Sequence, residues 1–63
     1  MKLGNYRNNK TGNVYTAIGF TTNATNAQDG QEMVMYISEE FNPDFRGTYV
    51  RSIEEFLTKF TRI

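Results

Sequence analysis

The segment from residue 13 to residue 22 constrains the fold more than any other part of the chain. Its residues are mostly β-branched or aromatic and carry no helical charge pattern, so it predicts one long strand. Its two expected faces carry Val14, Thr16, Ile18 and Phe20 on one side, and Tyr15, Ala17, Gly19 and Thr21 on the other. Neither face is strongly polar, which is typical of a bent strand that is covered on both sides. Gly19 inside the strand indicates a bulge, a barrel corner or the close approach of another backbone.

Shorter elements surround this strand, and turn residues separate them. Asn and Gly residues at 8–13 predict a turn that pairs residues 5–8 with the long strand as a hairpin. The other expected elements are an exposed loop or hairpin connection at 23–30, a strand at 32–38, a loop at 39–47, a strand at 48–51, one α or 3₁₀ turn at 52–57 and a final strand at 58–62. The helical turn is predicted from Ser52 and from Glu55 three residues later, a spacing typical of a capping box.

This order of elements predicts a mainly β protein with one domain over residues 1–63. The expected architecture is a small five-stranded SH3-like barrel with one short helical turn before the last strand. The residues that we expect in its core are Tyr15, Ile18, Met33, Met35, Tyr36, Ile53 and Phe56.

The small size of the chain favours self-association. Its 63 residues include no Cys and no His, so neither a disulfide nor an ordinary zinc site can stabilise the fold. A core this small offsets the conformational entropy of folding only narrowly, and a second chain would bury more apolar surface. We therefore expect a homo-oligomer, most simply a dimer. Phe60 supports a dimer because we expect it near an exposed terminus. Lys59 and Arg62 in the same strand would instead oppose pairing between strand edges.

Composition argues against several classes of function. Without His or Cys there is no imidazole base and no thiolate nucleophile, so we expect no catalysis, no cofactor and no metal. Seven basic and seven acidic residues give a formal net charge of zero, which argues against nucleic-acid binding. The sequence has no apolar run long enough for a membrane span, and its first five residues lack the core of a signal peptide. We therefore expect a cytoplasmic protein that does not bind membranes.

The candidate binding residues are arginines next to tyrosines, together with aromatic residues in a loop. An arginine beside aromatic rings can bind a carboxylate or phosphate while a ring stacks on a base or a peptide group. Two such combinations would meet if their strands were neighbours. The binding residues that we expect are Tyr6, Arg7, Phe41, Phe45, Tyr49 and Arg51.

Each of these residues also has a structural interpretation. Arg51 would stabilise the helical turn if it paired with Glu54 or Glu55. Phe41 and Phe45 would contact a partner if the loop exposed them, and would pack under the barrel end if it did not. The sequence leaves these alternatives open.

A series of short motifs resembles a family of small bacterial and phage domains of unknown function. The motifs are Tyr6-Arg7, Gly12-Asn13-Val14-Tyr15, Gly19, Met33-Val34-Met35-Tyr36, and Tyr49-Val50-Arg51-Ser52-Ile53-Glu54-Glu55-Phe56. The likeness spans nearly the whole chain and implies an SH3-type barrel. The sequence departs from the family pattern at Ser52, where proline is usual, at Asn8, where histidine is usual, and in a longer loop at 39–47. Because the family has no established activity, the resemblance implies a fold and no particular function.

Taken together, these features predict a non-catalytic binding module of bacterial or phage origin that engages a protein or peptide partner through loop aromatics and arginine. The alternative is a phage-type binder that sequesters a nucleotide-derived signal. A nucleotide pocket needs about 300–1,000 Å³, so a barrel of this size would have to form it between subunits.

Overall fold

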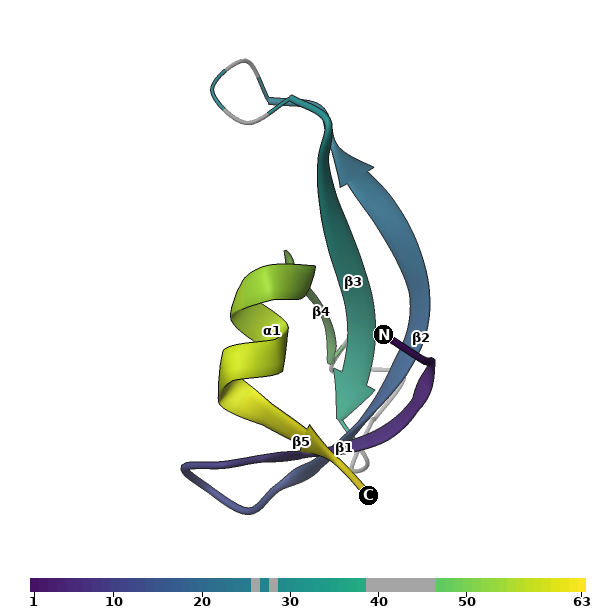
Figure 1. The fold of residues 1–63 in the computed structure, drawn as a ribbon. Helices are drawn as coiled ribbons and strands as arrows, with labels where there is room; N and C mark the ends of the chain where they lie inside the picture. The colour runs from purple at the N-terminus through teal and green to yellow at the C-terminus, as the bar shows by residue number, and fades with distance from the viewer. Residues whose placement is uncertain (26, 28, 39–46) are drawn as a thin grey trace.

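The computed structural model describes residues 1–25, 27, 29–38 and 47–63. Its strands form one antiparallel sheet in the order β4-β3-β2-β1-β5 (Figure 1). The elements in chain order are β1 (Gly4–Asn8), β2 (Val14–Asn23), β3 (Gln31–Ser38), β4 (Thr48–Ser52), α1 (Ile53–Lys59) and β5 (Phe60–Arg62). The mainly β class, the five strands and the short helix before the last strand are therefore confirmed.

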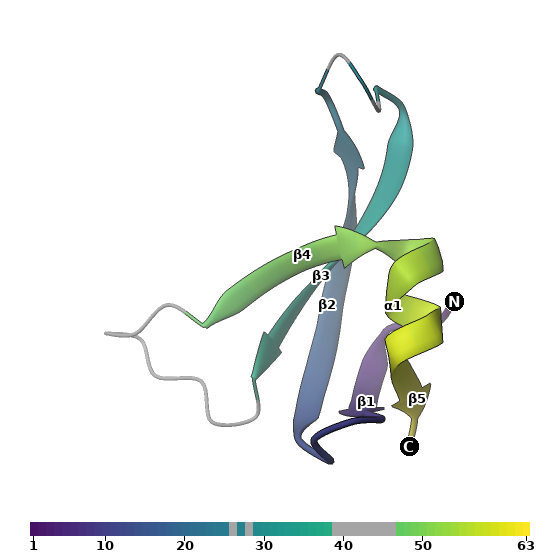
Figure 2. The ribbon, with the colours of Figure 1, turned by 90° about the vertical axis from the view of Figure 1, so that its left-hand side faces the viewer.

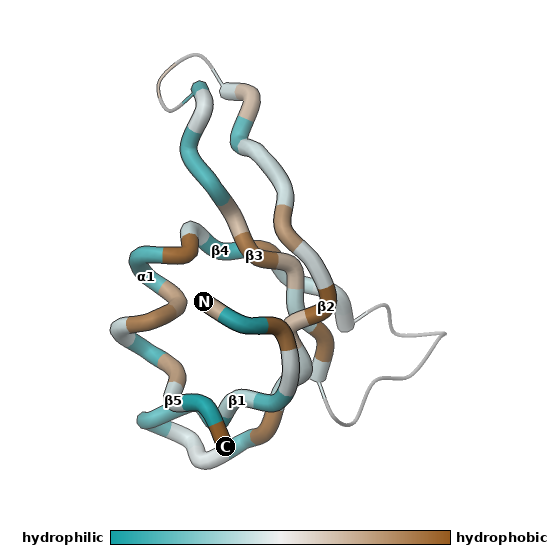
Figure 3. The backbone as a smooth tube through the Cα atoms, turned by 45° about the vertical axis from the view of Figure 1, so that its right-hand side comes forward, coloured by the Kyte–Doolittle hydropathy of each residue, from teal (hydrophilic) through white to brown (hydrophobic). Residues whose placement is uncertain are grey.

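The sheet bends around its inner face into a small barrel-like fold with the predicted SH3-like order of elements. Strands β4 and β5 are the two ends of the sheet, and α1 runs directly from one to the other. The helix packs against β3, β4 and β5 and spans the distance between the two end strands, so it covers the inner face of the sheet (Figure 2). Hydrophobic residues gather in this part of the molecule, whereas the far end of the β2–β3 hairpin is mainly hydrophilic (Figure 3).

A bulge in β2 produces the predicted bend near Gly19. The register with β3 shifts between Ala17 and Gly19, so Ile18 is the extra residue. A Cβ atom on Gly19 would lie 3.2 Å from the Met35 Cε atom, so the close approach is that of a side chain rather than a backbone. The bulge interrupts the alternation of faces, and Ile18 is 46% exposed. The prediction that Ile18 belongs to the core is therefore wrong.

An aromatic cluster fills the space between the sheet and α1. The buried hydrophobic residues of the described chain are Tyr6, Ala17, Val34, Tyr36, Phe56 and Phe60. Phe56 and Phe60 stack with their ring centroids 4.2 Å apart. Tyr36 and Phe56 are thus confirmed as core residues, Tyr15 and Ile53 pack at the edge of the core, and Met33 and Met35 are half-buried.

Phe60 does not lie at an exposed terminus as the sequence suggested. Strand β5 pairs with β1, and the pairing of Phe60 with Asn8 places the aromatic ring under the sheet. Phe60 is only 4% exposed. The argument for self-association through this side chain is therefore wrong, and any case for a dimer must rest on other residues.

The helix is longer than the single turn that was predicted. Ser52 caps it as expected, because its Oγ atom accepts a hydrogen bond of 3.2 Å from the backbone N–H of Glu55. The Glu55 carboxylate contacts Arg51 at 2.6 Å and Lys59 at 3.9 Å, one turn before and one turn after it. These contacts, with the burial of Phe56, extend α1 to seven residues.

Candidate functional site

Three tyrosines form a row on the inner face of the sheet. Tyr36 and Tyr49 are direct cross-strand partners on β3 and β4, with ring centroids 5.5 Å apart. The Tyr15 ring on β2 lies 5.6 Å from that of Tyr36 and 6.2 Å from that of Tyr49. Tyr36 is buried, Tyr15 is half-buried and Tyr49 is 40% exposed. The row therefore leads from the core to the surface.

Arg51 lies beside this row because it shares a face of β4 with Tyr49. Its Nε atom donates a hydrogen bond of 3.1 Å to the Tyr36 hydroxyl, and its Nη1 atom lies 2.6 Å from a carboxylate oxygen of Glu55. The Cζ atom also lies 6.0 Å from the centroid of the Phe60 ring. The ion pair with Glu55 is thus present, and the same guanidinium contacts the aromatic row.

These contacts fix the orientation of Arg51 and leave part of it available. The hydrogen bond to Tyr36 raises the pKa of Arg51, partial burial lowers it and Glu55 raises it again, with a net rise above its ordinary value. The guanidinium therefore stays charged at physiological pH. An arginine has five N–H donors, and within the described part of the chain two of them have the partners named above. The remaining donors can bind a ligand.

The tyrosine row and Arg51 line a cavity of about 180 Å³, which we call the aromatic groove. Its residues are Asn8, Tyr15, Tyr36, Tyr49, Arg51 and Phe60. The buried rings of Tyr36 and Phe60 form the floor, and the more exposed Tyr15 and Tyr49 form the walls. Pockets for drug-sized ligands have volumes of about 300–1,000 Å³. The groove therefore has room for one flat side chain or ring rather than for a whole nucleotide.

Tyr6 and Arg7 do not join this groove. The two tyrosine–arginine combinations would meet only if their strands were neighbours, and they are not, because β2 and β3 separate β1 from β4. Tyr6 is 3% exposed and packs edge-on against Phe56, and its hydroxyl donates a hydrogen bond to the Lys2 carbonyl. Arg7 is exposed and follows Tyr6 directly, so it lies on the opposite face of the strand. The β1 residue that does line the groove is Asn8.

Phe41 and Phe45, the two predicted loop contacts, lie outside the described residues. Of the four predicted site residues that the structure describes, Tyr49 and Arg51 come together in the groove. Sequence reasoning assigned Tyr15 and Tyr36 to the core alone. Tyrosines at positions that share a face across three strands are the signal that could have indicated a groove, but only once the strand register was known.

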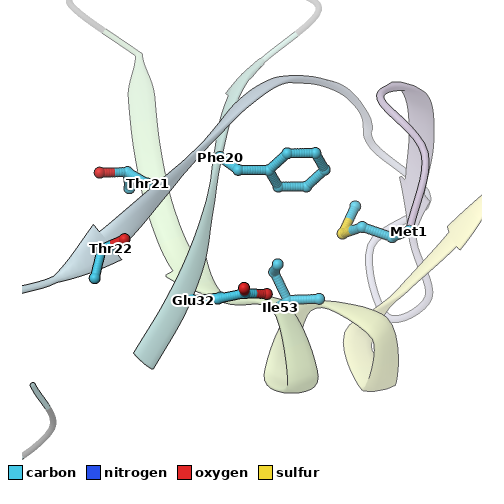
Figure 4. A pocket seen from close by; sticks show the side chains of 6 residues that line it. All are labelled: Met1, Phe20, Thr21, Thr22, Glu32 and Ile53. Carbon is cyan, nitrogen blue, oxygen red and sulfur yellow. The ribbon is translucent and has the colours of Figure 1, made fainter. Parts of the chain in front are cut away.

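A second cavity, of about 350 Å³, lies on another side of the molecule. Figure 4 shows the Phe20 ring and the Met1 side chain extending toward each other, with Ile53 beside them and Glu32 close by. Phe20 and Met1 are 48% and 38% exposed. Thr21, Thr22 and Glu32 line this hollow together with the apolar residues. It has no arginine held beside aromatic rings, as the aromatic groove has, so it is the weaker candidate for a specific ligand.

In the described part of the chain, no helix has both the length and the apolar character that a membrane span requires. Comparison of the chain with protein-family models, with curated proteins and with solved structures found no match. The argument for function therefore rests on the geometry of the site.

Proposed function

We propose that the protein is a non-catalytic binding module whose aromatic groove holds a segment of a protein or peptide partner. The observation that carries this proposal is the position of Arg51, which two hydrogen bonds hold at the end of an aromatic row. Tyrosine and arginine are, with tryptophan, enriched among the residues that contribute most of the binding energy at protein interfaces. Here the buried floor fixes their geometry, so binding would cost little side-chain entropy.

The size of the groove supports a peptide more than a small molecule. A groove of about 180 Å³ takes one side chain, and a peptide can continue beyond it along β4, which is an end strand of the sheet. The alternative, a nucleotide-derived signal, would need space beyond the groove itself. The SH3-like order of elements agrees with peptide binding, but only as an analogy at the level of the fold.

Peptides selected from a randomised library against the immobilised domain test this proposal. We expect the selected peptides to lose at least tenfold in affinity for Tyr49→Ala, because the variant removes one wall of the groove. Val50→Ala is the matched control. Val50 is 56% exposed and follows Tyr49 on β4, so its side chain points to the opposite face of the strand. Equal loss of affinity in both variants, or no loss in either, would show that the groove does not bind the peptides.

Self-association remains part of the proposal, with the apolar surface around Phe20 in place of Phe60. The Phe20 and Met1 side chains extend toward each other in Figure 4 and are 48% and 38% exposed, and a second copy would remove them from water. We expect light scattering at high micromolar concentration to give twice the mass of one chain. Phe20→Ser should reduce that mass to the monomer value. A monomer mass for the unaltered chain at every concentration would refute the dimer and the intersubunit nucleotide pocket together.

A further inference from the structure

A different cavity from the hollow of Figure 4, with a volume of about 320 Å³, adjoins the aromatic groove, and we call it the basic cleft. The β1–β2 turn forms one side, and the last residues of α1 form the other. The cleft and the groove share two lining residues, Asn8 and Arg51. The principal side chains that the cleft adds are Lys10, Thr11, Thr58 and Lys59.

Backbone and side-chain hydrogen bonds hold the two sides of the basic cleft together. The Asn8 Oδ1 atom accepts from the backbone N–H groups of Lys10 and Thr11, at 2.9 and 3.1 Å, which fixes the turn. The backbone N–H of Asn9 donates to the carbonyl of Lys59 at 2.9 Å. This bond occupies a carbonyl at the negative end of α1 and holds the turn that carries Lys10 next to the end of the helix that carries Lys59. The cleft is therefore preorganised at the level of the backbone.

The charges that line the cleft do not balance. Lys10, Arg51 and Lys59 are positive, and Glu55, which contacts two of them, is the carboxylate beside them. Among the described residues, no carboxylate lies within ion-pair distance of Lys10. Three cations against one carboxylate leave a local surplus of two positive charges in a chain whose net charge is zero. A bound anion would relieve this repulsion.

We propose that the basic cleft binds an anionic group, a carboxylate or a phosphoryl group. The group belongs to the same peptide that places a flat side chain in the aromatic groove. The anion contacts Lys10 and Lys59, and Arg51 lies between the two subsites because it lines both cavities. The link between the subsites rests on the proposed function, whereas the anion site itself stands on the geometry and charge of the cleft.

NMR titrations of the ¹⁵N-labelled chain with inorganic phosphate and with acetate test the anion site. We expect saturable shifts of the backbone amides of Lys10, Thr11 and Lys59. Lys10→Ala and Lys59→Ala should each weaken binding about three- to fivefold, in line with the worth of an exposed charge pair. Lys2→Ala, which removes the same charge away from the cleft, should leave binding unchanged. The tighter of the two anions identifies the chemical source of the group.

A third probe, phenyl phosphate, tests the link between the cleft and the groove. We expect it to bind at least tenfold more tightly than inorganic phosphate and to shift the ring resonances of Tyr15 and Tyr49. Equal affinity of the two phosphates would overturn the shared ligand and would leave the anion site standing. The absence of saturable shifts with every anion, or unchanged affinity in both lysine variants, would overturn the anion site. In that case the groove would still be tested separately by the selected peptides.

Discussion

Replacing Phe56 with alanine should unfold the domain or leave it on the edge of unfolding. Phe56 is completely buried and stacks on Phe60, and its ring centroid lies 5.1 Å from those of both Tyr6 and Tyr36. Truncation of a buried phenylalanine costs about 3–5 kcal/mol. The total stability of small domains lies near the low end of about 5–15 kcal/mol. The lost free energy is therefore comparable with the whole free energy of unfolding.

Urea denaturation followed by circular dichroism measures this effect, and Leu57→Ala is its matched control. Leu57 is the next residue on the same helix, but it is 50% exposed, so its loss should cost about 0.5 kcal/mol or less. Both variants place alanine in the same helix, and the gain in helix propensity is larger for Phe56→Ala, so propensity works against the expected loss. If both lowered the free energy of unfolding equally, the aromatic cluster would not be the core that the structure describes.

Replacing Arg51 with alanine should weaken binding of the selected peptides at least tenfold. Hydrogen bonds to a charged group are worth about 1.5–3 kcal/mol, which corresponds to roughly ten- to 150-fold in affinity. Arg51→Lys should restore little, because an ammonium group lacks the fork that contacts Tyr36 and Glu55 while presenting further donors. Isothermal titration calorimetry with a selected peptide gives the affinities.

Two controls separate ligand binding by Arg51 from its structural contacts. Arg7→Ala removes an exposed arginine outside the groove and should leave affinity unchanged. Glu55→Gln removes the ion-pair partner, which is half-exposed, so it should change stability by less than about 1 kcal/mol. It should also retain most of the affinity, because the bond from Arg51 to Tyr36 remains. An Arg51→Ala variant that bound as tightly as the unaltered chain would show that the guanidinium has only a structural role.

Local patterns in the sequence were enough to predict the strands and the position of the helix. Alternation of side chains located β2 and β3 to within one residue, and Ser52 located the helix cap. The length of α1 was underestimated, because the ion pairs of Glu55 and the burial of Phe56 add to its weak local preference.

Errors arose where contacts between distant segments decide the structure. The alternation that placed Ile18 in the core fails at the bulge, whose register with β3 is not visible in the local sequence. Tyr6 and Phe60 are buried because β1 and β5 pair across more than 50 residues of chain. The same long-range pairing brings Asn8 to the groove and moves Tyr6 and Arg7 away from it. Tyr49 and Arg51 do lie together in the groove, because their two-residue spacing puts them on one face of a strand.

The central claim is that the aromatic groove contacts the ligand, and intermolecular nuclear Overhauser effects test it most directly. The measurement uses a selected peptide at saturation with the isotope-labelled chain. We predict contacts from the peptide to the ring protons of Tyr15 and Tyr49 and to the side chain of Arg51. Contacts confined to Met1, Phe20 and Ile53, in the hollow of Figure 4, would contradict the claim.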